Sequence, residues 1–288
     1  MSTLSEKRVY AEQGEPTPVY VAAEQGLVRA KLSGDAVGEF SLARSCTARD
    51  VALGDDGLLA LATTEETLVG GDAELLQQTG FGSAVAVSFV ADTGAGRIPT
   101  AASGALIAAT GAGRVARLPL DTSETARPTS DDWTDLGPIE GVRAIDGSLI
   151  AAESGVSRMV DDTLEHAGLS DVRDVAARGA PLAATGEGLY ELGNGWMVAR
   201  DTAHDIIATD GERAHAVDTD GALFAREGRE WVGTAFPIES RPADVAYTPD
   251  GVVVATESGS LLVDAGDGWR SRALGVTGVQ AVAAPRIE

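Results

Sequence analysis

The sequence predicts an all-β protein, a single closed β-propeller of seven four-stranded blades. Three observations predict it. An apolar segment recurs seven times, the turn glycines between Gly26 and Gly259 are about 39 residues apart on average, and the last predicted strand matches an incomplete first repeat. A repeat of this length is typical of propeller blades.

Each recurring segment is a short apolar run that ends in a small, mostly acidic turn. The seven copies occupy residues 19–28, 58–69, 106–115, 149–156, 182–189, 214–223 and 252–261. Six of these turns contain glycine, and Glu66 is near the equivalent place in the second copy. The runs are bounded by Gly and Asp and lack the three-and-four spacing of apolar residues that a helical solenoid needs, which favours strands.

Further signals on either side of each copy complete a four-stranded unit. A short strand precedes most copies, and glycine-bearing turns connect the two strands at 56–57, 146–147, 210–211 and 250–251, as tight hairpins prefer. Downstream, a second hairpin leads to Trp133, Trp196, Trp231 or Trp269, which we expect to pack between blades. Each unit therefore contains four strands, a to d.

The ends of the repeat predict how the ring closes. The first copy begins at strand b, whereas residues 279–283 form an unmatched strand a at the other end of the chain. We expect this strand to complete the first blade, because closure removes exposed strand edges. The predicted domains are an N-terminal tail, 1–17, and the propeller, 18–285. Blade three is the longest, and its polar segments 91–103 and 121–132 are expected to be surface loops.

The composition is strongly acidic, with 44 Asp and Glu against 22 Lys and Arg, of which only Lys7 and Lys31 are lysines. Replacement of surface lysine by acids and arginine indicates a halophilic protein, whose net charge of −22 is screened by concentrated salt. The charge excludes nucleic acid as the expected partner, because phosphate binding needs clustered Lys and Arg.

The sequence predicts a cytoplasmic protein. Residues 1–20 contain no apolar run that resembles a signal peptide, no segment approaches the length of a membrane span, and Cys46 is the only cysteine. No membrane association and no disulfide are therefore expected. We favour a monomer.

Several phrases resemble a known family. CTARDVALG at 46–54, VRAIDGSLIAAESGV at 142–156 and the segment 171–196, together with the lysine-poor composition, are similar to an uncharacterised β-propeller family of haloarchaea. The resemblance spans nearly the whole chain. It implies a propeller fold and a haloarchaeal cytoplasmic setting, and it carries no activity or catalytic residues.

Candidate site residues come from the start of strand a, which lines the channel of a propeller. Asp recurs there beside Arg or His, and we expect a partial ring around one channel mouth. The candidates for ligand or partner binding are Arg49, Asp50, Arg143, Arg173, Asp174, His204, Asp205 and Asp244. The b–c turns add acids to the same face. Such a ring can bind an anion or a basic segment, or it can be a structural device in which each Asp satisfies backbone groups.

No catalytic residues are predicted. The sequence contains no nucleophile elbow, phosphate-binding loop or dinucleotide fingerprint in strand-and-helix context, and no cofactor is expected. The three histidines lack metal-ligand spacing. The presence of a metal stays open, since Asp50, Asp174, Asp205 and Asp244 would supply calcium ligands if they converged across the channel.

Three functions follow as hypotheses. The first is a non-catalytic scaffold that binds an unidentified protein through the channel-mouth face. The second is a calcium-dependent hydrolase or lactonase, in which the channel acids hold the metal. The third is a sensor that binds a small anion through its arginines without turnover.

Overall fold

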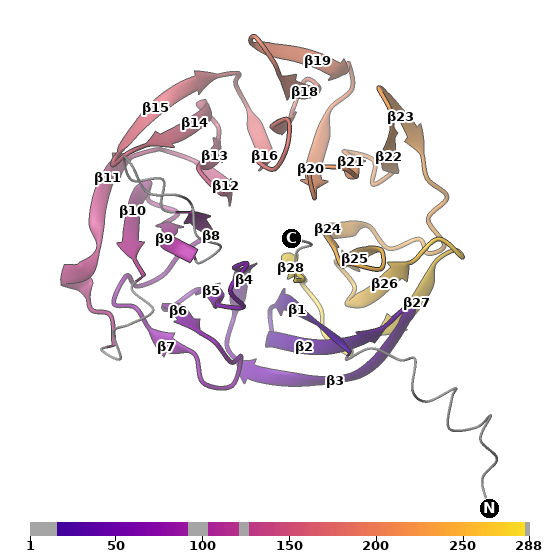
Figure 1. Cartoon of the computed structure of the whole chain (residues 1–288), viewed down its shortest axis with the longest axis horizontal. Coiled ribbons are helices and arrows are strands. Elements are labelled where there is room, and N and C mark those ends of the chain that lie inside the picture. Colours follow the sequence, from indigo (N-terminus) through magenta and orange to yellow (C-terminus); the bar gives the residue numbers. More distant parts are fainter. Residues whose placement is uncertain (1–15, 92–102, 121–126, 286–288) are drawn as a thin grey trace, which may run out of the picture.

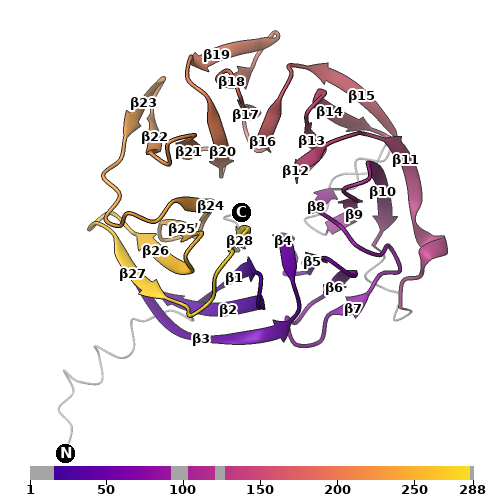
Figure 2. The same ribbon diagram turned by 180° about the vertical axis from the view of Figure 1, so that it is seen from behind.

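A computed structural model describes residues 16–91, 103–120 and 127–285 of the chain. The described strands form seven separate four-stranded antiparallel sheets. The sheets stand around a common axis, and one edge strand of each sheet is innermost (Figures 1 and 2). The predicted fold class, a seven-bladed all-β propeller, is confirmed.

The blades follow one another along the chain, except that the last strand belongs to the first blade. Blade 1 contains β28 (Ala281–Ala283), β1 (Thr17–Ala23), β2 (Gly26–Ser33) and β3 (Ala36–Ser45). Blade 2 contains β4 (Ala48–Leu53), β5 (Leu59–Thr63), β6 (Thr67–Gly70) and β7 (Gln77–Gln78). Blade 3 contains β8 (Ala86–Ala91), β9 (Ser103–Ala109), β10 (Arg114–Pro119) and β11 (Thr134–Pro138), with a 3-10 turn at Ser130–Asp132.

The other four blades have the same order of strands, each given from the channel outwards. Blade 4 contains β12 (Val142–Asp146), β13 (Leu149–Ala152), β14 (Gly155–Val160) and β15 (Thr163–Gly168). Blade 5 contains β16 (Val172–Ala176), β17 (Leu182–Thr185), β18 (Leu189–Leu192) and β19 (Trp196–Arg200). Blade 6 contains β20 (His204–Thr209), β21 (Ala214–Asp218), β22 (Leu223–Glu227) and β23 (Glu230–Gly233). Blade 7 contains β24 (Pro242–Tyr247), β25 (Val252–Thr256), β26 (Ser260–Asp264) and β27 (Arg270–Ala273).

Burial explains the sequence pattern of each strand. The second strand of a blade is covered on both faces by neighbouring blades, so β13 and β17 are buried at every position and have apolar runs rather than alternation. The outermost strands face solvent, and all four residues of β27 are exposed. The repeat was therefore easiest to detect at strand b.

The core is distributed between blades rather than gathered at one centre. One cluster packs Tyr20 and Leu27 of blade 1 against Val51 and Leu61 of blade 2. At the outer wall, Trp196 of blade 5 donates its indole N–H to Ala167 of blade 4 at 2.8 Å. The predicted packing of tryptophan between blades is thus seen at this junction.

Ring closure occurs as predicted. β28 pairs antiparallel with β1, with Val282 opposite Val21. The C-terminal strand supplies the innermost strand of blade 1, next to β4 and β24 (Figure 1). The two chain ends thereby complete one sheet.

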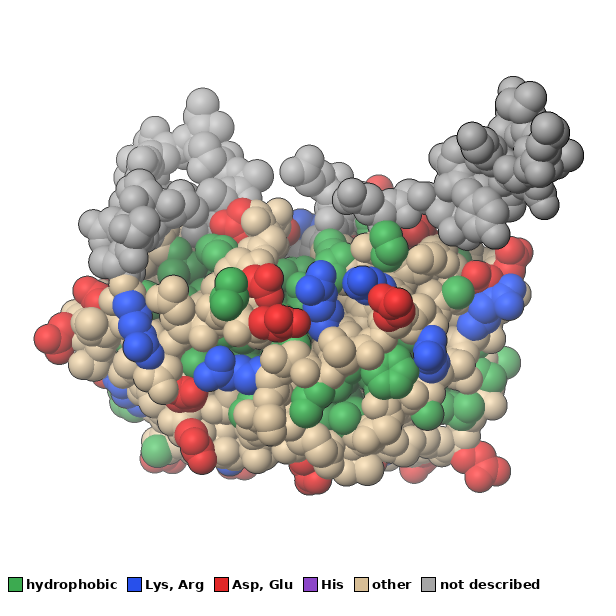
Figure 3. All heavy atoms as spheres, turned by 90° about the horizontal axis from the view of Figure 1, so that it is seen from below, with side chains coloured by type: hydrophobic (Ala, Val, Ile, Leu, Met, Phe, Trp, Pro, Cys, Tyr) green, Lys and Arg blue, Asp and Glu red, His purple; other side chains and the backbone are tan. Residues whose placement is uncertain are grey.

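Parts of the sequence-based prediction lie outside the described residues. The tail 1–17 is described only from residue 16. Of the two polar segments of blade 3, 91–103 falls almost wholly within 92–102, and the first half of 121–132 falls within 121–126. Among the described residues, no helix has the length and apolar character required to cross a membrane. Seen from the edge, basic and acidic side chains are mixed on the outer wall (Figure 3). Among the described ion pairs, Lys31 lies 3.3 Å from Glu39.

Candidate functional site at the channel mouth

The seven innermost strands enclose a channel of about 650 Å³. Its wall combines small side chains, including Ala52, Ala144, Ala176 and Ala246, with several carboxyl groups. Small residues leave the centre of the ring open, because their side chains do not reach the axis. The channel is the described feature on which the candidate residues converge.

Strand pairing shows which residues occupy equivalent places around the mouth. In five blades the innermost strand carries a β-bulge at its second residue, next to the b–c turns. The bulged residues and their counterparts in blades 1 and 3 all line the channel. We call this set the mouth ring: Gln280, Arg49, Val85, Arg143, Arg173, Asp205 and Ala243, in order from blade 1 to blade 7.

This register corrects one part of the predicted ring. The sequence aligned Asp205 with Asp50, Asp174 and Asp244, whereas the structure places Asp205 at the bulge, level with the arginines. In blade 6 the position of the three aspartates is taken by Ile206, which pairs with Val217. The aspartates therefore form two levels, because Asp205 is the bulged residue of its strand, whereas Asp50, Asp174 and Asp244 each follow the bulged residue.

Ion pairs join the mouth ring across blades 4 to 7. Arg143 binds Asp171 at 2.6 Å, Arg173 lies 3.8 Å from Asp171, and Asp205 accepts hydrogen bonds from both Arg173 and Arg241. Glu153 and Glu257 close the two ends, each 3.5 Å from an arginine. We call this chain of charges the ionic belt: Glu153, Arg143, Asp171, Arg173, Asp205, Arg241 and Glu257.

Arg49 differs from the arginines of the belt. Its side chain is exposed at the mouth, and it has no hydrogen-bond or ion-pair partner among the residues described. Its neighbours in the mouth ring are Gln280 and Val85, neither of which carries a charge. Arg49 is thus the mouth arginine whose donors are available to a ligand.

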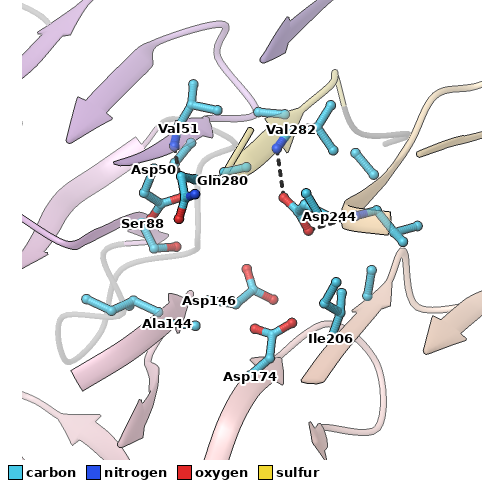
Figure 4. Close-up of a pocket in the computed structure, with 18 of the residues that line it drawn as sticks. Asp50, Val51, Ser88, Ala144, Asp146, Asp174, Ile206, Asp244, Gln280 and Val282 are labelled. Atoms are coloured by element: carbon cyan, nitrogen blue, oxygen red, sulfur yellow. Dashed lines mark hydrogen bonds between the residues drawn. The ribbon is translucent and has the colours of Figure 1, made fainter. Parts of the chain in front are cut away.

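One level deeper, aspartates connect neighbouring blades. Asp50 accepts the N–H of Val51 in its own strand and, through its second oxygen, the N–H of Val87 in the next blade, both at 2.8 Å. Asp174 makes the same pair of bonds with Val175 and Ile207. Figure 4 shows these carboxyls in the channel wall. Each carboxylate therefore links two blades through backbone donors.

The pattern extends to three other junctions. Asp244 accepts from Val245 and from Val282 of the closing strand at 2.7 Å (Figure 4). Two residues deeper, Asp146 accepts from Ala177 at 2.7 Å, and the Ser88 hydroxyl accepts from Gly147 at 2.9 Å. We call Asp50, Ser88, Asp146, Asp174 and Asp244 the blade links. They satisfy backbone donors that the propeller geometry leaves without a strand partner.

Enclosure by protein opposes ionisation of these groups. Burial raises the pKa of Asp50 and of Asp174 to about 7, although the backbone donors to each carboxyl pull in the other direction. The pKa of Asp244 is also raised by burial, with the charges of Asp174 and Asp50 adding to it. The channel therefore holds acids that titrate near neutral pH, and burial is the main cause.

His204 lies outside the channel. It is fully buried, its ring nitrogen Nδ1 is 2.6 Å from the carbonyl oxygen of Thr202, and its ring packs edge-on against Phe224. Burial lowers its pKa, which favours the neutral ring. The other seven predicted candidates line the channel, and His204 does not.

Sequence reasoning missed Asp146, Asp171 and Arg241. Asp146 was identified only as part of an Asp-Gly turn, and Asp171 and Arg241 lie in loops before the innermost strands. Arg241 stands directly before Pro242, two residues before the bulged Ala243, and Asp171 stands two residues before the bulged Arg173, so a search extended by two residues upstream of the mouth positions would have found both. Asp146 had no such signal, because the sequence does not show that its carboxyl lies beside the N–H of Ala177 in the next blade.

The arrangement favours binding over metal chemistry. Within residues 16–91, 103–120 and 127–285, no three His, Cys, Asp or Glu side chains are grouped so as to hold a metal ion. Both oxygens of Asp50, Asp174 and Asp244 already accept backbone N–H groups, and Asp205 is bound by two arginines. Calcium would have to displace these donors to gain several oxygen ligands.

Fold and site together define a closed seven-bladed propeller with an open channel and a charged mouth. The chain belongs to the family described as "Beta-prop_HVO_0234:-like, beta propeller", whose model matches residues 3–285. The resemblance to a propeller family is thereby confirmed. No curated protein sequence matches the chain.

Solved structures share the fold at low sequence identity. The WD40 propeller domain of Doa1 is 12% identical, with a TM-score of 0.66, and the match covers 93% of this chain and 90% of that domain. YCF48 bound to D1 peptide is 16% identical, with a TM-score of 0.56 over 78% of this chain and 82% of the other. The designed protein Ika8 is 12% identical, with a TM-score of 0.58 over 94% and 91%.

Proposed function

We propose that this protein is a non-catalytic scaffold that binds a partner protein through the channel-mouth face. The observation that carries the proposal is the rim itself: ion pairs hold the mouth ring in place across blades 4 to 7, while the donors of Arg49 have no partner among the described residues. A rim held by such contacts is preorganised, so little ordering opposes the binding of a partner.

Two further considerations support a scaffold. YCF48 was solved with a peptide bound, which makes peptide recognition compatible with this fold. The acids of the channel are engaged as blade links, which favours a structural role for them over a metal-dependent hydrolase. We place the scaffold in the cytoplasm of a halophile, because its acidity suits concentrated salt.

The proposal is tested by photo-crosslinking in a halophilic host grown in molar salt. A photoreactive amino acid replaces Ser154, which is exposed on a b–c turn at the mouth, or Asp250, which is exposed on an a–b turn of the opposite face. We expect a discrete crosslinked protein from position 154 and none from position 250. Crosslinks from position 250 alone, or from neither, contradict binding at the mouth.

A matched substitution makes the test specific. Arg49→Gln removes the charge at the mouth, and Arg229→Gln removes a charge from an exposed residue on the β22–β23 hairpin at the outer wall. The crosslink from position 154 is expected to weaken with Arg49→Gln and to persist with Arg229→Gln. Equal loss in both variants points to non-specific electrostatic attraction.

A further inference from the structure

The mouth is divided into two parts of different character. The ionic belt covers blades 4 to 7, where the arginines are committed to Asp171, Asp205 and the terminal glutamates. Blades 1 to 3 contribute Gln280, Arg49 and Val85 to the mouth ring, and none of these side chains makes a described ion pair. We call this second part the open sector.

Acidic residues of the rim are also distributed unevenly. Six of the seven b–c turns carry an acid: Glu24, Glu65, Glu153, Glu187, Asp220 and Glu257. The turn of blade 3 consists of Gly111, Ala112 and Gly113 and has none. The loop before β8, residues 80–84, also lacks an acid. The b–c turn of blade 3, the blade next to that of Arg49, therefore carries no acid of its own. Its nearest acids along the rim are Glu65 and Glu140, the latter in the loop after β11, where the Ile139 N–H donates to Gly113 at 2.8 Å.

The structure requires a small residue at Gly113 of the blade 3 turn but not at Ala112. Gly113 has a φ of 96°, and a Cβ there would lie 2.9 Å from the carbonyl oxygen of Ile139, so this position requires glycine. Ala112 is exposed and has no such restriction. An acid would fit at Ala112 as it does in the other turns, and its absence leaves the approach to Arg49 open to a negative charge.

We propose that the open sector binds an acidic peptide segment of a partner protein, with a carboxylate of the segment held by Arg49. The inference rests on the proposed function and names the chemistry of the partner. Arginine suits this role because its planar fork of donors matches a carboxylate with two hydrogen bonds. The segment approaches over blade 3, since acids of the rim repel it from the b–c turns of the other blades.

The inference is tested with short fluorescein-labelled peptides and fluorescence anisotropy. The probes are a glutamate-rich peptide and versions with glutamine or lysine in place of glutamate. Binding is measured at the lowest KCl concentration at which circular dichroism shows a folded protein, because salt screens the contact. We expect the glutamate peptide to bind the wild-type protein more tightly than either of the other peptides.

Two variants at the open sector and two controls locate the contact. Arg49→Gln is expected to weaken binding of the glutamate peptide by about tenfold, because it removes a charge-assisted pair of hydrogen bonds. Ala112→Glu restores the missing acid and is expected to weaken it similarly without removing any native contact. Arg229→Gln and Ser154→Glu, the latter on a turn that already carries Glu153, are expected to have little effect. Unchanged melting temperatures verify that the variants are folded.

The possible outcomes separate this inference from the scaffold proposal. If Ala112→Glu and Arg49→Gln leave binding of the glutamate peptide unchanged, the open sector is not the site and the inference is wrong. If the lysine peptide binds instead, or no peptide binds, the partner is not acidic, although crosslinking from position 154 still tests the scaffold. If inorganic phosphate displaces the glutamate peptide at equal concentration, Arg49 serves a small anion and the peptide proposal fails.

Discussion

At the residue scale, the carboxyl of Asp174 is subject to two opposing effects. Hydrogen bonds from Val175 and Ile207 favour the carboxylate, whereas enclosure in the channel wall and the negative charges of Asp146 and Asp50 favour the neutral acid. The raised pKa of about 7 shows that enclosure prevails. A residue that links two blades therefore changes its charge near neutral pH.

The raised pKa of Asp174 determines whether its contribution to folding stability rises or falls with pH. The folded pKa of Asp174 is above its unfolded value of about 3.9, so the folded state binds the proton more tightly. The contribution to stability is complete below about pH 4 and is lost as the pH rises through about 7. Burial lowers the pKa of His215 to about 4, so its contribution to folding stability increases as the pH rises from about 4 to about 6.5. The net pH profile of the wild type therefore combines opposing contributions.

A substitution at Asp174 separates its contribution to stability from those of the other titrating groups. Asp174→Asn has only one acceptor oxygen, so one of two enclosed N–H groups loses its partner, which costs about 1–3 kcal/mol. We expect this loss in the free energy of unfolding at pH 5 and a smaller loss at pH 8, where the wild-type carboxylate is ionised. Denaturant titrations at the two pH values, in constant molar KCl, measure the difference.

Asp250→Asn serves as the control for that experiment. Asp250 is exposed on the turn before β25, and its substitution removes the same formal charge. We expect it to leave the free energy of unfolding close to the wild-type value at both pH values. A cost of Asp174→Asn that grew from pH 5 to pH 8 would contradict the sign derived above.

At the element scale, closure by β28 combines three contacts. The strand pairs with β1, its Val282 N–H is bound by Asp244 of blade 7, and the buried Val282 packs in the core between blades 7 and 1. Loss of the strand would leave the inner edge of β1 without a partner and Asp244 without a donor from the next blade. Blade 1 would then be joined to blade 7 by its outer strands, where Arg270 pairs with Asp35 and Arg272 donates to Val37 and Gly38.

We therefore predict that deletion of residues 276–288 lowers the melting temperature by many degrees or prevents soluble expression. The matched control ends the chain at residue 285, which retains all of β28. It is expected to melt like the full-length chain. Thermal denaturation by circular dichroism measures both, and equal melting of the two truncations is incompatible with closure by this strand.

The outer strands give a second prediction at this scale. Trp196→Phe removes the hydrogen bond from blade 5 to Ala167 of blade 4 and is expected to cost about 1 kcal/mol beyond the change in ring size. Trp269→Phe provides the comparison, because Trp269 packs against Phe236 and no described partner receives its indole N–H. Chemical denaturation should show the larger loss for Trp196. A loss that is equal in the two variants indicates packing alone.

At the scale of the whole molecule, charge is the dominant property. The net charge of −22 is spread over a closed ring, and many surface arginines already pair with acids, as Arg226 does with Glu191 at 2.9 Å. The remaining carboxylates repel one another in dilute buffer, where the screening length is about 30 Å at 0.01 M salt and about 3 Å at 1 M.

We predict that the melting temperature rises steeply from dilute buffer to molar KCl. A parallel series in sucrose separates screening from the general stabilisation that excluded solutes provide. The increase in KCl should exceed the increase in sucrose at matched osmolality. Equal midpoints in dilute buffer and molar KCl would remove the case for a halophilic protein.

The sequence alone determined the number of blades, the order of strands and the closing strand. This was possible because the second strand of every blade is buried on both faces, which produces a repeated apolar run. It also located seven channel-lining residues, which include the link aspartates Asp50, Asp174 and Asp244 but not Asp146, since the start of strand a recurs a short distance before that run. His204 was misplaced because alternation along a strand decides which residues face the channel.

Only the tertiary structure decided what those residues contact. Asp205 is the bulged residue of β20 and is therefore level with the arginines, and the position of a bulge leaves no mark in a single sequence. The ionic belt includes residues from loops of varying length. The pairing of Asp171 with Arg173 and of Arg241 with Asp205 therefore depends on how the blades are arranged in the closed ring. The same closure placed backbone donors of one blade beside carboxyls of another, and it left Arg49 without a partner among the described residues, in the blade next to the one b–c turn that lacks an acid.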